Sequence, residues 1–448
     1  MGLSGVVNTK MISSEVVGRF FKEFALAFFW GGVLIGLFFV WSLPVRAPAP
    51  SLLAQIGAGE PRKKSPQELF AEARAKSSKI KALYMTADVA RDGGRGATAL
   101  REHLIRMADE TEINGIVIDV KEVCGPDYDG ARLESLLEEL HQKNIWAIAR
   151  IVAFKDASQR EAHPEWYLTR KTKKQFGEEC LRKKHLRAPS SKFQVPSSVL
   201  WQDNRGGYWM DPASQGARAY IADIAKKMID IGFDELQFDY ARFPSDGDVS
   251  AAQYPAWDGE TPKHAVLKSF FEYLRKTLKQ HKPNIILSAD IFGYVAAQGE
   301  DLTIGQRLDD IGDNFDYVSF MVYPSHYYGG FFMPDDPERG REAVHYTFAE
   351  ARAHPGVVVG RSLMAARDFF DGIATTSGAT SSPAALGVRA RIRPWLEDFF
   401  HEDDRASGRP WGKEKVRLQI DAAESVEDHG WMLWNAANVY TDEALRKE

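Results

Sequence analysis

Short apolar segments alternate with amphipathic stretches along most of this chain, and this alternation restricts its fold more than any other feature. Eight segments are predicted to be β-strands because they are short, rich in β-branched or aromatic residues and bounded by polar ones. They are residues 81–85, 115–120, 145–152, 235–239, 285–290, 317–323, 390–396 and 431–435. Eight alternating βα units over about 370 residues predict an α/β fold, a (β/α)8 TIM barrel, with an open doubly wound sheet as the alternative.

Between these segments, apolar residues recur at spacings of three and four, which predicts helices. The predicted helices are residues 99–111, 131–143, 217–231, 265–281, 338–353 and 415–427, with a shorter one near 304–312. Two connections are too long for plain loops: the aromatic-rich residues 155–211 and the small-residue-rich 366–389. In a barrel the first of these leaves the C-terminal rim, so we expect it to overhang the mouth.

An apolar segment without charges, residues 24–43, precedes the predicted barrel and is long enough to cross a bilayer as a helix. Basic residues before it predict a cytoplasmic N-terminus, residues 1–23. Its apolar stretch exceeds a signal-peptide core, which favours an uncleaved single-pass anchor over a cleaved signal or a buried helix. Residues 44–79 are predicted to be a linker with room for one short helix, and residues 80–448 a barrel outside the cytoplasm.

Charge and motif patterns disfavour several classes of ligand. The net charge of −5 provides no overall positive field for nucleic acid, and the basic run at 170–187 is typical of solvated loop surface or a local anion contact. No glycine-rich phosphate loop follows the first strand, and no His, Cys or Asp cluster has metal-ligand spacing, so neither a cofactor nor a metal is predicted. Cys124 and Cys180 either pair, as an oxidising compartment would allow, or remain free thiols.

Carboxylates end two neighbouring strands at the same rim of the predicted barrel. In residues 235–239, Leu236 and Phe238 share the outward parity, which leaves Asp239 as the last inward side chain. Asp290 ends the next strand in the same way. Because active sites of this fold lie at the C-terminal rim, the two acids predict glycoside hydrolysis, in which one carboxyl protonates the leaving oxygen and the other attacks the anomeric carbon or activates water.

Other polar and aromatic side chains reach the same rim and are candidates for substrate binding. They are Asp119, Lys121, Arg150, Arg242, Tyr323, His326, Trp395, Asp398, Trp434 and Asn435. Each also has a structural interpretation, as an ion-pair partner or as barrel filling. We expect Arg242 to orient Asp239, because a guanidinium stays protonated. Glu397, beside Asp398, is a further acid, so the sequence leaves the identity of the pair open.

The chain carries six motifs in this order: "GIVIDVKEVCG", "DELQFDYARFP", "SADIFGY", "DYVSFMVYPSHY", "RIRPWLEDF" and "GWMLWNAANVY". Together they resemble a bacterial family of uncharacterised proteins labelled "putative glycosyl hydrolase domain", over about residues 80–441. The resemblance implies a TIM barrel, a carbohydrate substrate, Asp239 as nucleophile and Asp290 as acid/base. Relatives tend to have Gln where this chain has Glu397, and the 366–389 segment is also a departure.

These patterns predict a membrane-anchored O-glycosyl hydrolase that acts on a cell-envelope or extracellular polysaccharide. The alternative is a non-catalytic barrel that binds glycan through its aromatic rim. A membrane-bound nucleotide hydrolase is disfavoured because the phosphate-binding loop is missing.

Overall fold

The structure is a computed structural model, and it describes residues 62–170, 179–180, 200–298, 302–376, 390–399, 401 and 411–447. The chain divides into two units, Met1–Lys63 and Lys64–Glu448, and the second contains the barrel. The segment at 24–43 lies outside the described residues, so the membrane span stays a prediction. Among the helices that the structure describes, none combines the length and the apolar character needed to cross a membrane.

Eight parallel strand positions close into a barrel, because the first strand pairs with both the second and the last. In barrel order they are β1 (Ile80–Met85), β2 (Gly115–Glu122), β4 (Trp146–Val152), β6 (Glu235–Asp239), β8 (Ile286–Phe292), β9 (Tyr317–Met321), β12 with β13 (Arg391–Ile392 and Trp395–Glu397) and β14 (Gly430–Trp434). The seventh position is divided at Pro394, which lacks the N–H that a strand ladder needs. The predicted (β/α)8 barrel is confirmed.

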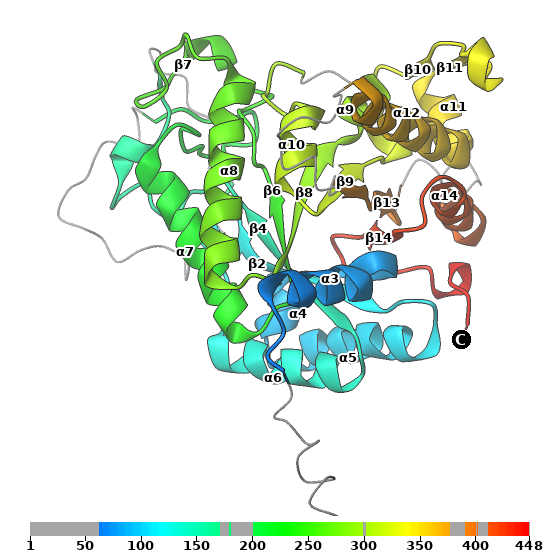
Figure 1. The fold of residues 1–448 in the computed structure, drawn as a ribbon, viewed down its shortest axis with the longest axis horizontal. Helices are drawn as coiled ribbons and strands as arrows, with labels where there is room; N and C mark the ends of the chain where they lie inside the picture. Colours follow the sequence, from blue (N-terminus) through cyan, green and yellow to red (C-terminus); the bar gives the residue numbers. More distant parts are fainter. Residues whose placement is uncertain are drawn as a thin grey trace, which may run out of the picture. The chain divides into compact units, whose positions relative to one another are not determined.

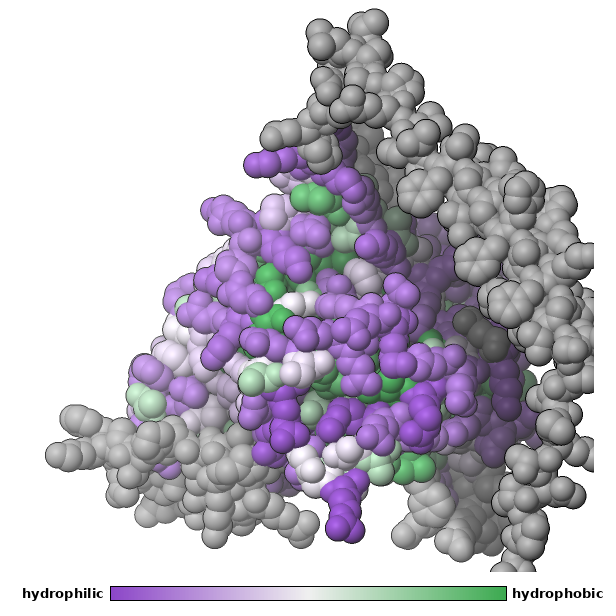
Figure 2. Space-filling view, turned by 90° about the horizontal axis from the view of Figure 1, so that it is seen from below, coloured by the Kyte–Doolittle hydropathy of each residue, from purple (hydrophilic) through white to green (hydrophobic). Residues whose placement is uncertain are grey.

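Helices surround the strands on the outside (Figure 1). Those that connect one barrel strand to the next are α5 (Arg95–Glu110), α6 (Gly130–Gln142), α7 (Gln215–Ile231), α8 (Lys263–His281), α10 (Leu308–Asn314), α12 (Pro355–Thr376) and α14 (Lys413–Val426). Their apolar faces and the outward residues of the strands, Leu236 and Phe238 among them, form one large buried cluster. Figure 2 shows the face that holds α5 and α6, where hydrophilic side chains cover most of the surface. The helices are therefore amphipathic, as their spacing predicts.

Short elements complete the described chain. They are α3 (Pro66–Lys76), α4 (Ala87–Arg91), α9 (Gly293–Gln298), α11 (Phe348–Ala353), β3 (Gly125–Pro126), β5 (Thr169–Arg170), β7 (Ala252–Gln253), β10 (Phe331–Met333) and β11 (Val344–Tyr346). The pairs β5–β7 and β10–β11 form two small antiparallel sheets outside the barrel.

The prediction of a helix at 338–353 is wrong over most of its length. The chain there leaves a 3-10 helix (Pro337–Arg339) and forms β11, which pairs with β10, and it is α-helical only in α11 at its end. In β11, Val344 is buried and His345 is exposed, so the apolar residue belongs to a strand alternation and not to a helical face. The long helix is α12, which begins at Pro355, a residue that suits a first helical turn, and continues into the predicted connection at 366–389.

The helix α3 lies within the segment predicted to be a linker. Ser65 and Glu68 form a reciprocal capping box at its start. Ala73 packs with Ile286 and Tyr317 of the barrel, and the Ser77 and Tyr317 hydroxyls lie 2.9 Å apart. The barrel unit therefore begins at Lys64, earlier than the residue 80 expected from the sequence.

An ion pair fills the barrel interior at the end where the strands begin. Arg393 lies 2.9 Å from Glu235, and both side chains are inaccessible to solvent. The guanidinium also lies 3.7 Å from the Tyr317 ring centroid and donates to the Ser77 carbonyl. These charges are paired, so the interior is packed at this end of the barrel. In this fold, active sites lie at the opposite, C-terminal rim.

Candidate active site

Arg150, on β4, connects three carboxylates at the C-terminal rim. Its Nη1 donates to Asp119 Oδ1 at 2.6 Å, its Nη2 donates to Asp239, and its Nε lies 3.7 Å from Asp290 Oδ2. The acids end or nearly end β2, β6 and β8, and β4 lies between β2 and β6 in the barrel. Asp239 is 5% exposed and Asp290 1% exposed. The structure therefore brings the two predicted catalytic acids together beside one buried cation.

Backbone geometry fixes the orientation of Asp239. Its Oδ1 accepts a hydrogen bond of 2.6 Å from the N–H of the next residue, Tyr240. Tyr240 has a φ of 50°, in the left-handed region that residues other than glycine seldom adopt. Such strain persists where the surrounding structure imposes it, and it is concentrated at functional sites. The turn leaves Oδ2 of Asp239 to Arg150.

Asp290 lies in a different environment from Asp239. Trp395 donates its indole N–H to Asp290 Oδ1 at 2.8 Å. Burial raises the pKa of Asp290 well above its usual value, and the charge of Asp239 raises it further, while Arg150 opposes the shift. A carboxyl that holds its proton to higher pH has the property that a general acid requires.

Tyr84, on β1, belongs to the same network and was missed by the sequence analysis. Its hydroxyl donates to Asp119 Oδ2 at 2.5 Å. Its ring stacks on Trp434 with centroids 3.8 Å apart, and the Arg150 guanidinium lies 4.8 Å from the centroid of Trp434. Burial raises the pKa of Asp119, and its contacts with Arg150 and Tyr84 offset part of that rise. Tyr84 has the inward parity of its strand, one residue from its end, so the argument that identified Asp239 could have found it.

The aromatic side chains of Tyr323, Trp395 and Trp434 form one wall around the acids. The rings of Trp395 and Trp434 meet edge to face at 5.5 Å. Burial raises the pKa of the Tyr323 hydroxyl, and the nearby charges of Asp290 and Asp239 raise it further. Because Trp395 is 1% exposed and Tyr323 5% exposed, this wall limits the access of water to the carboxylates.

Three of the residues predicted to bind substrate have their polar groups occupied by protein partners. Lys121 is inaccessible and lies 2.8 Å from Asp156. Asp398 accepts hydrogen bonds from both the N–H and the hydroxyl of Thr441. Asn435 donates to the Asp398 carbonyl at 2.6 Å. These contacts join chain segments at the rim and support the structural interpretation of all three.

Arg242 does not orient Asp239, contrary to expectation. Its Nη1 donates to the Phe243 carbonyl and to Ser245 Oγ, both at 3.1 Å, and its guanidinium lies 4.5 to 5.0 Å from the ring centroids of three aromatic residues. These rings belong to Phe292, Tyr240 and Trp209. The left-handed turn at Tyr240 directs the following residues toward the 155–211 segment, so Arg150 takes the role expected of Arg242.

Glu397 belongs to a neighbouring cluster. Its Oε2 accepts hydrogen bonds from the backbone N–H and the hydroxyl of Ser325, at 3.1 and 2.6 Å, and its Oε1 lies 3.5 Å from His401 Nε2. Neither Glu397 nor Asp398 shares the Arg150 guanidinium. The geometry therefore favours Asp239 with Asp290 over a pair that contains Glu397 or Asp398.

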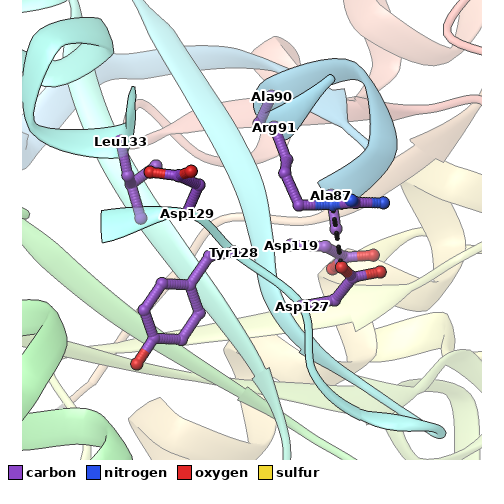
Figure 3. A pocket seen from close by; sticks show the side chains of 8 residues that line it. All are labelled: Ala87, Ala90, Arg91, Asp119, Asp127, Tyr128, Asp129 and Leu133. Atoms are coloured by element: carbon purple, nitrogen blue, oxygen red, sulfur yellow. Dashed lines mark ion pairs between the residues drawn. The ribbon is translucent and has the colours of Figure 1, made fainter. Parts of the chain in front are cut away.

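A small pocket reaches the network from behind Asp119 (Figure 3). It encloses about 190 Å³, part of it open to solvent, and is lined by Ala87, Ala90, Arg91, Asp119, Asp127, Tyr128, Asp129 and Leu133. Arg91 and Asp127 form an ion pair of 2.9 Å within it. Neither Asp239 nor Asp290 lines it, so we do not place the scissile bond there. In the described ranges, no group of three or more His, Cys, Asp or Glu side chains is arranged to hold a metal ion.

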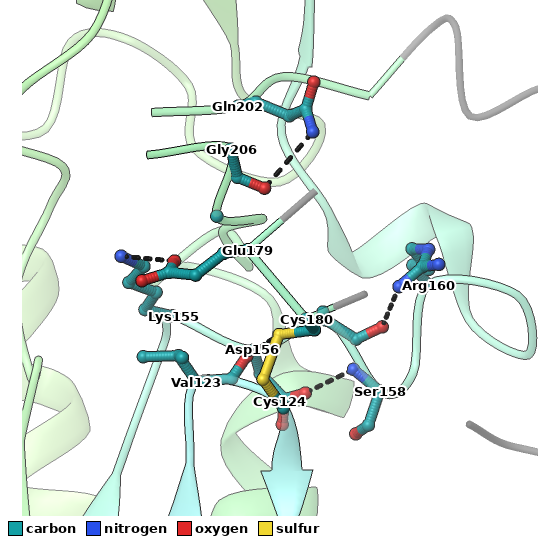
Figure 4. Close-up of a disulfide and its surroundings, with 12 residues drawn as sticks. Val123, Cys124, Lys155, Asp156, Ser158, Arg160, Glu179, Cys180, Gln202 and Gly206 are labelled. Atoms are coloured by element: carbon teal, nitrogen blue, oxygen red, sulfur yellow. Dashed lines mark hydrogen bonds and ion pairs between the residues drawn. A yellow bond between two sulfur atoms is a disulfide. The ribbon is translucent and has the colours of Figure 1, made fainter. Parts of the chain in front are cut away.

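Cys124 and Cys180 form a disulfide, with their Cα atoms 5.5 Å apart (Figure 4). The bond joins the loop after β2 to the 155–211 segment. Beside it, Glu179 lies 2.8 Å from Lys155 Nζ, which also lies 3.0 Å from Asp203. Of the two states that the sequence allowed for these cysteines, the structure has the paired one.

Solved structures and one protein family are similar to this chain. No curated protein matches the sequence. One matching structure is a hypothetical protein from Ruminiclostridium thermocellum, with 26% identity over 46% of this chain and 96% of that one and a TM-score of 0.35. A second is the PgaB (BpsB) glycoside hydrolase domain from Bordetella bronchiseptica, with 12% identity over 80% of this chain and 95% of that one and a TM-score of 0.48. A third is the α-galactosidase TtGalA from Thermus thermophilus, with 14% identity over 85% of this chain and 64% of that one and a TM-score of 0.43. The family described as "putative glycosyl hydrolase domain" matches residues 82–440, from β1 to beyond β14, and the chain belongs to this family.

Proposed function

We propose that this protein is a glycoside hydrolase in which Asp239 and Asp290 cleave the glycosidic bond. The observation that carries the proposal is the convergence of both carboxylates on the guanidinium of Arg150 at the barrel rim. Their surroundings differ, since Asp239 has an ion-pair hydrogen bond to Arg150, while Asp290 is almost fully buried against Trp395. Two carboxyl groups in unequal environments can divide the roles of acid and nucleophile.

In the proposed reaction, Asp239 attacks the anomeric carbon while Asp290 gives its proton to the glycosidic oxygen. The bond between carbon and oxygen breaks, the leaving sugar departs with that proton, and the remaining sugar is esterified to Asp239. Asp290, now a carboxylate, takes a proton from water, and the water oxygen displaces Asp239. One water is consumed, both acids return to their first state, and the anomeric configuration is retained.

The substrate that we propose is a polysaccharide of the cell envelope or of the extracellular space. Membership of a family described as "putative glycosyl hydrolase domain" supports a carbohydrate ligand. The disulfide supports a location outside the cytoplasm, because such bonds persist in oxidising compartments. We assign residues 24–43 as the anchor that holds the body there. Loss of the membrane fraction on deletion of residues 24–43 would support this anchor, whereas unchanged fractionation would contradict it.

The test of catalysis uses the full-length protein in detergent, as wild type and as Asp239→Asn and Asp290→Asn. Each form is incubated with a panel of envelope and extracellular polysaccharides, and new reducing ends are measured. We expect the wild type to release them and both variants to lose about 10²–10⁴-fold in rate. Equal rates in all three forms would refute the proposal. Glycan that is retained equally by wild type and Asp239→Asn, without cleavage, would indicate the non-catalytic glycan-binding barrel.

A further inference from the structure

A row of aromatic rings leads from the acid pair to the surface. It starts at Tyr323, whose ring meets that of His326 edge to face at 5.1 Å. The next ring, Tyr328, lies 6.0 Å from His326 and is tilted from it by 21°. Phe348 follows at 5.7 Å from Tyr328 and 23°. We call His326, Tyr328 and Phe348 the aromatic row.

The rings of the aromatic row are more exposed to solvent than Tyr323, from which the row starts. Tyr323 is 5% exposed, whereas Tyr328 is 74% exposed. His326 is also exposed, and Phe348 is half-buried. A single exposed aromatic residue needs no explanation. A continuous run of rings that begins at a candidate active site is different. Solvent-exposed rings contribute little to folding, because their apolar surface stays in water, and that surface remains available to a ligand.

Short ordered elements hold these rings in place. His326 ends a 3-10 turn, Pro324–His326, which Glu397 fixes through Ser325. Phe348 is the first residue of α11, where Thr347 and Glu350 form a capping box. In Figure 1, α11 lies together with β10 and β11 at one edge of the barrel. Rings that are already positioned lose little conformational entropy when a ligand stacks on them.

The chemistry of the aromatic row fits a sugar chain. Its rings have apolar faces, which can stack on the apolar face of a sugar ring. His326 and Tyr328 also carry polar groups at the ring edge, and these can hydrogen-bond to the hydroxyls of the sugar. Its continuity with Tyr323 places it in line with the bond to be cleaved. A purely apolar protein partner would not need a path that leads to two carboxylates.

We infer that the aromatic row binds successive sugar units of a polysaccharide on one side of the bond cleaved at Asp239 and Asp290. This inference rests on the proposed function and identifies the residues that hold the polysaccharide beyond the cleaved bond. A chain that occupies the row gains stacking energy at each unit, so affinity should increase with chain length until the row is filled.

Binding to the aromatic row can be measured without catalysis. Full-length Asp290→Asn protein in detergent is run by native affinity electrophoresis through gels that contain soluble starch, galactomannan or glycol chitin. We expect retardation in at least one gel. Adding Tyr328→Ala or Phe348→Ala should weaken the apparent affinity about 5- to 100-fold.

The matched control is Phe332→Ala. Phe332 is 60% exposed on β10, in the same part of the fold, but its ring contacts His345 and lies outside the aromatic row. It should leave retardation unchanged. Retardation in none of the gels, retardation that survives Tyr328→Ala and Phe348→Ala, or an equal loss with Phe332→Ala would each overturn the inference.

Cleavage assays separate this inference from the proposed function. With an active enzyme, kcat/KM should rise with oligosaccharide length in the wild type and rise less in Tyr328→Ala, while the shortest cleavable substrate is affected less than about twofold. Row-dependent binding without any cleavage would retain the aromatic row and reject the hydrolase. Cleavage with a chain-length dependence that Tyr328→Ala leaves unchanged would retain the hydrolase and reject the aromatic row.

Discussion

The indole N–H of Trp395 donates a hydrogen bond to Asp290 Oδ1 at 2.8 Å. Burial raises the pKa of Asp290, and this hydrogen bond opposes that shift because it favours the ionised carboxylate. Trp395 therefore lowers the pKa of Asp290 and with it the pH up to which the proposed acid stays protonated.

Trp395→Phe should move the alkaline limb of the pH–activity profile upward. The variant removes a donor to the carboxylate, so the pKa of Asp290 rises further and the acid stays protonated to higher pH. A shift of about one unit in the profile of kcat/KM is expected. Trp434→Phe is the control, because the Trp434 ring packs on Tyr84 and Arg150, whereas the indole that donates to Asp290 is that of Trp395. An unchanged or lower limb in Trp395→Phe would contradict the assignment of Asp290 as the acid.

Asp290→Asn should stabilise the protein at neutral pH while it abolishes activity. The pKa of Asp290 is raised in the folded state, so its contribution to stability is present below the unfolded value of about 4 and is lost as pH rises through the folded value. Asparagine removes this loss. The melting temperature should increase by about 2–4 °C at pH 7 and change little at pH 3.

Asp239→Asn provides the opposite case for the same calorimetric series. It removes a partner of buried Arg150, and the free energy of unfolding should fall by about 1–3 kcal/mol. If both variants changed the melting temperature in the same direction at pH 7, the unequal environments of the two acids would be disproved.

Arg150→Lys should reduce kcat by at least about 100-fold. A lysine ammonium lacks the planar fork that reaches Asp119 and Asp239 at once, so the carboxylates lose their common orientation. Arg242→Lys changes the same residue type at the same rim, but its guanidinium has no hydrogen bond to either proposed catalytic acid. The two variants should be compared in kcat and in melting temperature. Equal losses of kcat would show that Arg150 has no special role.

Loss of the disulfide should destabilise the barrel unit. The bond spans 56 residues of sequence, and constraint of such a loop in the unfolded chain is worth about 2–4 kcal/mol. Cys124→Ser with Cys180→Ser should lower the melting temperature, and a reducing agent should do the same to the wild type but not to the double variant. Thiol labelling of the wild type from intact cells should find no free cysteine before reduction. Two reactive thiols in the native protein would argue against an oxidising location.

The sequence predicts the barrel and the position of its acids because alternation along a strand encodes which face is buried. Leu236 and Phe238 lie in the outer core, and Asp239 points to the rim, as their parity requires. The same local rule fails at 338–353, where the spacing of apolar residues over a hairpin mimics a helix. It also omits Tyr84, which shares the parity but carries no charge to draw attention to it.

The tertiary structure decided which cation serves the acids. The sequence favours Arg242, which follows Asp239 by three residues, whereas Arg150 lies on a different strand. The order β2, β4, β6 places Arg150 between Asp119 and Asp239, whereas the left-handed turn at Tyr240 takes Arg242 away. The pairing of Cys124 with Cys180 also depends on a contact between segments 56 residues apart in the chain. Periodicity within a strand carries no information about register between strands or about such long-range contacts, which only packing determines.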